Sequence, residues 1–490
     1  MGVVALAAGL LTLNHYPTGV FYDDGLYAGL AWALAHGHGF THPNLPGSPA
    51  GVHFPPLFPA VLAPLFGTLS IPRAAFAGKV LDALCFAAAS GLLAAHAVRI
   101  RLLGDVPDWL APALVALAAV AIPVLTLLGA LMSEPLFALL LVGAIVLADR
   151  PPAGWSRRTP LLVGALAAGA LLTRSLGVAA GAGILLFVWR RGGAPKQLVR
   201  VALPVLGAGA LWGLWVLRHK AGIDPAIASD YGSYFDTVKS VGLGALGSSV
   251  TDLPRPLSVL TLNWVPSRLA YFAFGIPALV VGCYGLVLMM VRSALGWTLV
   301  LYLGILALWP FPPDRFLWAV LPGLALTWAA GAVDLWRHTG RAARIALAVL
   351  VLGMTYGYGR YEVRGFAHRW WDLTARSISA NFAEMLPALD SLPAGAVIAT
   401  DNEPLVWAAI RRTAVPFYLF AYRGRALLEP TPAFQRAYLE RSGVTHVLLS
   451  GTGTGSEDQL RRLMAAYPGW LAPAHLWPGG RTLYEVRRDR

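Results

Sequence analysis

Two adjacent acids, Asp23 and Asp24, follow the first apolar segment of the chain. Ionised groups beside hydrocarbon are costly unless they face water, a partner or a substrate, so acids in this place are candidates for function. A carboxylate that faces an aqueous cavity can act as a general base or orient an attacking hydroxyl, and two adjacent acids titrate together. The structural alternative is that Asp24 only caps a helix beginning near Gly25. That alternative leaves Asp23 without a role.

Cations that suit a phosphate lie at the ends of other apolar segments. Arg174 and Arg315 each present a planar guanidinium, which matches phosphate and stays charged when desolvated. Glu134 begins another apolar segment, at the end predicted to lie on the same side of the membrane as the two arginines. The alternatives are that the two arginines are interfacial anchors and that Glu134 only complements a helix dipole. Anchoring is the expected role of Arg218 and Lys220.

Metal and nucleotide motifs are weak in this sequence. The loop that follows the first apolar segment contains His36, His38, His42 and His53, but their spacing matches no tight zinc motif. Adjacent acids are also a poorer metal signal than two acids separated by one residue. We therefore expect no required cofactor, although the acids are compatible with a divalent metal. The run Gly451–Ser456 lacks the lysine and spacing of a phosphate loop, which favours a plain turn.

The composition is that of a membrane protein. Of 490 residues, 57% are hydrophobic and 13% are charged, whereas soluble proteins average about 25% charged. The net charge of +13 is concentrated in short loops, as the positive-inside rule predicts, so it does not indicate nucleic acid. Cys85 and Cys283 lie in apolar runs and indicate no disulfide.

Hydropathy predicts about eleven transmembrane helices. Met1–Leu13 lacks a signal-peptide pattern and is read as a short first span. Every second loop is basic, which makes those loops and the N-terminus cytoplasmic. The predicted spans are 1–15, 75–98, 110–129, 132–148, 160–173, 175–190, 200–218, 269–291, 294–309, 315–336 and 343–359.

The opposite side of the membrane is predicted to carry two large loops, the short turns 129–133 and 310–315, and the tail after about residue 360. The first loop, 16–74, carries the acid pair and an amphipathic-looking helix from Gly25 to His36, and the second is 219–268. The predicted organisation is an all-α polytopic domain over 1–360 and a small extracytoplasmic α/β domain over 361–490. In the tail we expect strands at 396–400, 445–450 and 482–486, and helices near 375–390, 403–413, 433–442 and 456–467.

Few reactions combine acids and cations at a membrane surface. One is sugar transfer from a polyprenyl-phosphate carrier. Its leaving group is a phosphate, which needs positive charge, and its acceptor hydroxyl needs a base. The anomeric carbon becomes cationic in the transition state, which a nearby carboxylate stabilises. The residues therefore fit this chemistry.

The sequence also resembles a known family. The run Tyr22–Tyr27, the turn Gly37–Phe40 and the segment Phe54–Pro59 resemble the first periplasmic loop of the C-type membrane glycosyltransferases, in particular protein O-mannosyltransferases and lipid A aminoarabinose transferases. Ser133–Phe137, Leu172–Arg174 and Arg315–Leu317 followed by Leu321-Pro322 also look like features of bacterial members. The resemblance covers about residues 1–360, and is less specific in the tail.

The resemblance implies that Asp23 is catalytic and that Asp24, where glutamate is usual, supports it. We expect Arg174 and Arg315 to hold the donor phosphate. Glu134, His53 and Tyr27 are candidate cavity residues, although His53 stands where Tyr or Phe is common.

The expected enzyme is an inverting glycosyltransferase of the bacterial inner membrane. It moves a monosaccharide from a polyprenyl-phosphate donor to an extracytoplasmic protein, lipid or glycan, with membrane lipid as its surroundings.

Two alternatives come from other classes. A flippase or transporter of polyprenyl-linked sugars also has many spans, but predicts ionisable residues at mid-membrane and inverted repeats. Lys79 and Asp82 lie near the start of their predicted span, and we find no repeat. A non-catalytic scaffold predicts that Asp23 is dispensable.

Overall fold

Helices occupy all eleven predicted apolar segments. The computed structural model describes residues 1–487 except 242–244, 310, 424–425, 451–453 and 479. The helices of these segments are α1 (Gly2–Thr12), α4 (Ile71–Arg99), α5 (Leu110–Val120) with α6 (Ile122–Leu128), α7 (Glu134–Ala148), α8 (Thr159–Thr173), α9 (Val178–Arg190), α10 (Pro195–His219), α15 (Arg268–Arg292), α16 (Ala294–Ala307), α17 (Asp314–Ala319) with α18 (Leu321–His338), and α19 (Arg341–His368).

Four helices of the described chain are long and apolar enough to cross a bilayer: α4, α10 with its 3-10 extension, α15 and α19. The pair α5–α6, bent by 62°, gives a fifth candidate, and six shorter apolar helices accompany them. The count of eleven spans therefore stays a prediction.

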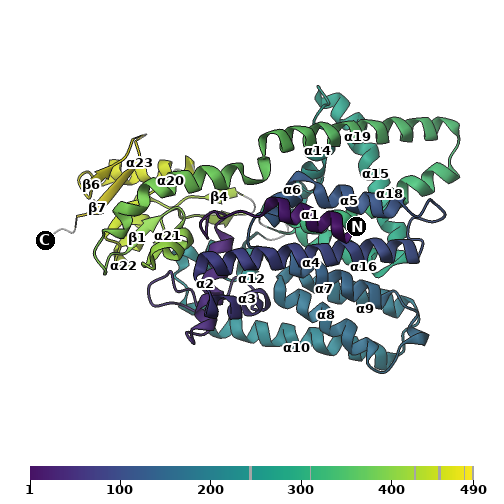
Figure 1. The fold of residues 1–490 in the computed structure, drawn as a ribbon, viewed down its shortest axis with the longest axis horizontal. Helices are drawn as coiled ribbons and strands as arrows, with labels where there is room; N and C mark the ends of the chain where they lie inside the picture. The colour runs from purple at the N-terminus through teal and green to yellow at the C-terminus, as the bar shows by residue number, and fades with distance from the viewer. Residues whose placement is uncertain (242–244, 310, 424–425, 451–453, 479, 488–490) are drawn as a thin grey trace.

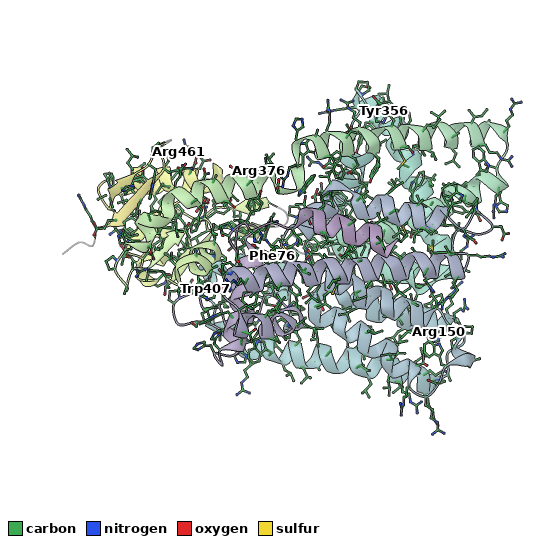
Figure 2. All side chains as sticks on the ribbon, viewed as in Figure 1. Phe76, Arg150, Tyr356, Arg376, Trp407 and Arg461 are labelled. Atoms are coloured by element: carbon green, nitrogen blue, oxygen red, sulfur yellow. The ribbon has the colours of Figure 1, made fainter. Side chains whose placement is uncertain are left out.

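The helices pack side by side along the long axis of the molecule (Figure 1). Neighbouring pairs include α4 with α1 and α7, α8 with α7 and α10, α9 with α16, and α15 with α18. Figure 2 shows Arg150, in a basic loop, at the end of this bundle that lies far from the C-terminal domain. The acid pair lies at the opposite end, where α2 (Asp23–Ala35) contacts that domain.

The loops form helices of their own. In the first loop, α2 begins at Asp23, two residues before the predicted start, and the prediction of an amphipathic helix is wrong. Its side chains are buried nearly all round, because two helices pack on it: α3 of the same loop, and α21 (Glu403–Ile410) of the C-terminal domain. The remaining loop elements are α3 (Leu57–Thr68), α11 (Ala228–Tyr231), α12 (Tyr234–Val241), α13 (Ala245–Asp252) and α14 (Arg255–Thr261), with 3-10 turns η1 (Pro152–Gly154), η2 (Ser175–Gly177), η3 (Lys220–Gly222), η4 (Pro225–Ile227) and η6 (Trp370–Asp372).

The tail is the α/β unit that the sequence predicts. Its sheet has the order β2-β1-β5-β7-β6, with β1 parallel to β2 and β5, and β7 antiparallel to β5 and β6. The helices are α20 (Leu373–Asp390), α21 (Glu403–Ile410), α22 (Pro432–Arg441) and α23 (Thr454–Ala466). The strands are β1 (Ile398–Thr400), β2 (Ala414–Pro416), β5 (His446–Leu448), β6 (Leu471–Leu476) and β7 (Thr482–Val486), with a hairpin of β3 (Ala421–Arg423) and β4 (Ala426–Leu428).

Candidate active site

Asp23 and Arg315 form an ion pair although 292 residues separate them in the sequence. Asp23 begins α2 and Arg315 lies in the first turn of α17, so two helix N-termini meet at this point. Arg315 Nη1 donates to Asp23 Oδ2. The side chains are 21% and 30% exposed, so the pair is accessible from outside. The structure thus brings together the predicted catalytic acid and one predicted phosphate ligand.

Glu134 connects the two predicted arginines. It is the first residue of α7 and its side chain is 2% exposed. Its Oε1 accepts from Arg315 Nε at 2.5 Å and from Arg174 Nη1 at 2.8 Å. Two carboxylates and two guanidinium groups therefore alternate from Asp23 to Arg174. Such mutual pairing is what allows charges to be buried.

Arg174 is more deeply enclosed than Arg315. It lies between α8 and η2, where the chain leaves the helix, and its side chain is 8% exposed. Its Nη1 also donates to Ser133 Oγ at 3.0 Å, and its guanidinium stacks 5.1 Å from the Phe316 ring centre. Ser133 in turn hydrogen-bonds the Tyr27 hydroxyl at 2.8 Å. Tyr27 and Arg174 line a separate small cavity of about 10 Å³.

A cavity of about 1000 Å³ opens beside Arg315. Its wall includes Asp314 and Arg315 from α17, Phe21 from the turn before the acid pair, and apolar side chains of α6 and α14. Arg255, an exposed residue at the start of α14, also lines it. The cavity is at the upper end of the usual size of ligand pockets. A single arginine in a long loop gives little signal in the sequence, so Arg255 was missed.

Asp24 does not line this cavity. It is 1% exposed, and its two carboxylate oxygens accept from the backbone N–H groups of Gly19 and Phe21, each at 3.0 Å. The interpretation of Asp24 as a helix cap is wrong, because these donors precede the helix rather than belong to its first turn. Burial raises the pKa of Asp24 to about 6, against the lowering effect of the amide bonds and of Lys79.

The first-loop histidines do not gather. His53 is buried, hydrogen-bonds the Gly232 carbonyl at 2.7 Å and lies 4.0 Å from the Tyr234 ring centre, so it ties the first loop to the second. Burial lowers the pKa of His53 to about 4. His42 packs edge-on against Tyr231, while His36 and His38 stack on Trp32. Among the described residues no three His, Cys, Asp or Glu side chains are grouped as metal ligands.

Two further features of the sequence analysis can be located in the structure. Lys79 and Asp82 of α4 are buried near the site: Lys79 donates to Asn14 Oδ1 at 2.8 Å, and Asp82 accepts from the Met132 amide at 3.1 Å. Both thus bond to residues at the end of the bundle that carries the acid pair. The run Gly451–Ser456 falls partly outside the described residues, and α23 begins at Thr454.

Comparison with known proteins identifies the fold. No protein-family model and no curated protein matches the sequence. The oligosaccharyltransferase of Archaeoglobus fulgidus, crystallised with zinc and sulfate, is 14% identical with a TM-score of 0.52, over 99% of this chain and 73% of that one. AglB from the same archaeon, in complex with an inhibitory peptide and a dolichol-phosphate, is 11% identical with a TM-score of 0.50, over 99% and 74%.

ArnT from Cupriavidus metallidurans, bound to undecaprenyl phosphate, also matches. It is 14% identical with a TM-score of 0.46, over 98% of this chain and 96% of that one. The likeness to the archaeal structures confirms, at the level of fold, the resemblance that the first loop indicates.

Proposed function

We propose that this chain, which has the fold of the C-type membrane glycosyltransferases, is an inverting glycosyltransferase. It takes a monosaccharide from a polyprenyl-phosphate carrier and transfers it to an acceptor outside the cytoplasmic membrane. The observation that carries the proposal is the Asp23–Arg315 pair, in which a partly exposed carboxylate binds a guanidinium that lines the cavity of about 1000 Å³. AglB binds a dolichol-phosphate, which supports a lipid-linked donor here.

The pair suits the two ends of the displacement. Asp23 accepts the proton of the acceptor hydroxyl while that oxygen bonds to the anomeric carbon. The bond from the anomeric carbon to the phosphate oxygen breaks on the opposite face, and polyprenyl phosphate leaves with the bonding electrons. Arg315 stabilises the charge that develops on that phosphate. Because Arg315 supplies positive charge, the proposal includes no metal.

Donor binding also affects the base. In the structure Arg315 Nη1 binds Asp23, while its Nε binds Glu134. A donor phosphate in the cavity competes with Asp23 for the same guanidinium. Asp23 then shares its counter-ion with the phosphate, so its carboxylate is free to accept a hydrogen bond from the acceptor hydroxyl. Glu134 keeps the arginine in place during this exchange.

The remaining parts of the proposal concern orientation. Helix α2, which begins with the acid pair, lies against the C-terminal domain (Figure 1), and the cavity is lined by Phe21, Arg315 and, from that domain, Tyr422. We place these parts on the extracytoplasmic side because the basic loops lie at the other end of the bundle. The basic residue Arg150 marks that other end in Figure 2.

The test is Asp23→Asn in the purified full chain. A panel of undecaprenyl-phosphate sugars, including mannose, glucose and aminoarabinose, is supplied with an envelope extract from cells lacking the protein, and transfer of labelled sugar is measured. We expect the variant to bind donor but not to transfer sugar. Asp236→Asn, which removes an exposed acid paired with Lys220, is the matched control. Turnover by the Asp23 variant at the wild-type rate overturns the proposal.

A further inference from the structure

The backbone immediately before Asp23 is strained. Tyr22 has φ of 65° and ψ of −70°, and the Asp23 amide donates to the Phe21 carbonyl at 2.8 Å across it. This is the positive-φ form of the γ-turn, which is rare and unfavourable for a bulky side chain. Such conformations persist only when surrounding contacts enforce them, and they concentrate at functional sites.

The Tyr22 side chain is held by the C-terminal domain. Its hydroxyl donates to Glu403 Oε1 at 2.6 Å, across 381 residues of sequence. Glu403 begins α21 and is 1% exposed. The same oxygen accepts from the Tyr231 hydroxyl at 2.5 Å, and Tyr231 accepts from Asn44 Nδ2 at 2.7 Å. One buried carboxylate thus joins the first loop, the second loop and the C-terminal domain.

The chain on either side of Tyr22 is equally confined. A Cβ atom on Gly19, whose φ is +106°, would lie 2.5 Å from Leu405 Cα. A Cβ atom on Gly25 would lie 2.6 Å from Pro404 Cβ. Both glycines therefore let the turn lie directly against the start of α21. The Asp24 carboxylate fixes the same turn from within through the Gly19 and Phe21 amides.

Aromatic contacts lock α21 onto α2. The Trp32 and Trp407 rings lie edge to face at 5.5 Å. The Arg411 guanidinium lies 4.7 Å from the Trp32 ring centre and 4.3 Å from that of Trp407. Figure 2 shows Trp407 at the junction of the helical bundle and the C-terminal domain. The helix that carries Glu403 is therefore fixed relative to the helix that carries Asp23.

We propose that Glu403 of the C-terminal domain is a positioning residue that holds Asp23 in its reactive orientation by clamping the strained turn at Tyr22. The inference rests on the proposed function. Relaxation of Tyr22 to an ordinary conformation changes the direction in which the chain enters α2, and so moves Asp23 relative to Arg315. Displacement of a reacting group by about 1 Å can lower a rate ~100-fold. The C-terminal domain is then a component of the active site.

The experiment removes the clamp from each of its two sides. Tyr22→Phe deletes only the hydroxyl, and Glu403→Ala deletes the acceptor. We expect each to lower kcat for labelled-sugar transfer by roughly 10- to 100-fold, with the Kd for undecaprenyl-phosphate sugar unchanged within about 2-fold. The double variant is expected to lose no more than Glu403→Ala alone, because Glu403→Ala already removes the bond from Tyr22. Glu403→Gln keeps an acceptor oxygen and is expected to restore most of the rate.

Tyr16→Phe is the matched control. The Tyr16 hydroxyl also joins the first loop to a buried carboxylate near the C-terminal domain, that of Asp372 at 3.0 Å, but Tyr16 is outside the turn. The kcat of the Tyr16→Phe variant is expected to stay within about 2-fold of wild type, since the bond from Tyr16 to Asp372 has no part in the γ-turn. Thermal unfolding of every variant is recorded. If Tyr22→Phe is unfolded at the assay temperature, the comparison of kcat between Glu403→Gln and Glu403→Ala tests the inference in its place.

The outcomes separate the two proposals. Wild-type turnover in Asp23→Asn overturns the proposed function, and the inference with it. An inactive Asp23→Asn together with wild-type kcat in Tyr22→Phe and Glu403→Ala overturns the inference alone. Equal losses in Tyr16→Phe and Tyr22→Phe also overturn it, because the effect is then general loosening of the interface.

Discussion

Replacing Arg315 and Arg174 by glutamine separates a substrate ligand from a structural cation. In the sequence the two residues are alike: each is an arginine at the predicted outer end of an apolar segment. In the structure Arg315 lines the large cavity and is 30% exposed. Arg174 is 8% exposed and its Nη1 is engaged by Glu134 and Ser133. We therefore expect Arg315→Gln to impair donor binding and Arg174→Gln to impair stability.

The magnitudes follow from these contacts. A hydrogen bond to a charged group contributes about 1.5–3 kcal/mol, so Arg315→Gln should raise the donor Kd roughly 10- to 100-fold. Removing one partner of a buried ion pair destabilises a protein by about 3–5 kcal/mol. The lower end, about 3 kcal/mol, applies to Arg174→Gln, because Arg315 still contacts Glu134 in that variant.

The assay compares two quantities for each variant. Kd for undecaprenyl-phosphate sugar is measured by thermophoresis in detergent, and the unfolding temperature is measured by intrinsic fluorescence. Arg315→Lys, which keeps the charge but loses the fork, distinguishes charge from geometry. The reasoning is refuted if Arg174→Gln weakens donor binding more than Arg315→Gln while its unfolding temperature equals that of wild type.

Two further predictions concern Arg255 and Asp24. Arg255→Gln should raise the donor Kd by up to about 5-fold, and this effect should disappear at high salt because Arg255 is exposed. Arg218→Gln, an exposed control at the predicted outer end of α10, should leave the donor Kd unchanged. Equal effects of the two substitutions contradict the assignment of the cavity as the donor site. The folded pKa of Asp24, about 6, is above its reference value of 3.8, so its contribution to stability is complete below pH ~4 and is lost as pH rises through about 6, a change of up to about 3 kcal/mol. The difference in unfolding temperature between wild type and Asp24→Asn should therefore become less favourable to wild type from pH 4 to 7, and a constant difference contradicts the raised pKa.

Local pattern was sufficient to predict the helices and much of the tail. A bilayer requires long apolar segments, and this requirement is visible in the sequence without knowledge of contacts. The strand at Thr482–Val486 was predicted with its observed bounds. The strands β2 and β6 were missed: β2 ends at Pro416, and β6 contains Pro473 and pairs irregularly with β7. Such strands are defined by their partners.

The candidate site likewise has some features that local sequence shows and others that depend on contacts between distant residues. Asp23, Arg315 and Glu134 were identified because charged residues at the ends of apolar segments are conspicuous. Their pairing was not predictable, because Asp23 and Arg315 are 292 residues apart. The sequence likewise could not show that the oxygens of Asp24 are occupied by Gly19 and Phe21, since the turn that presents these amides is formed by contacts with α21.

The contact of α2 with the C-terminal domain also bears on the predicted division at residue 360. One hydrophobic core contains Leu30 and Phe40 of the first loop together with Trp407 and Phe417 of the tail. A helix with a water-facing side would carry polar residues there, and α2 instead buries Leu26, Tyr27 and Leu30 to 2% exposure or less. Without residues 361–490 the side of α2 that meets α21 is open to water, which is unfavourable for apolar side chains. The apolar composition of α2 is thus explained by the helices that cover it, and the first loop and the tail share one hydrophobic core beside the acid pair.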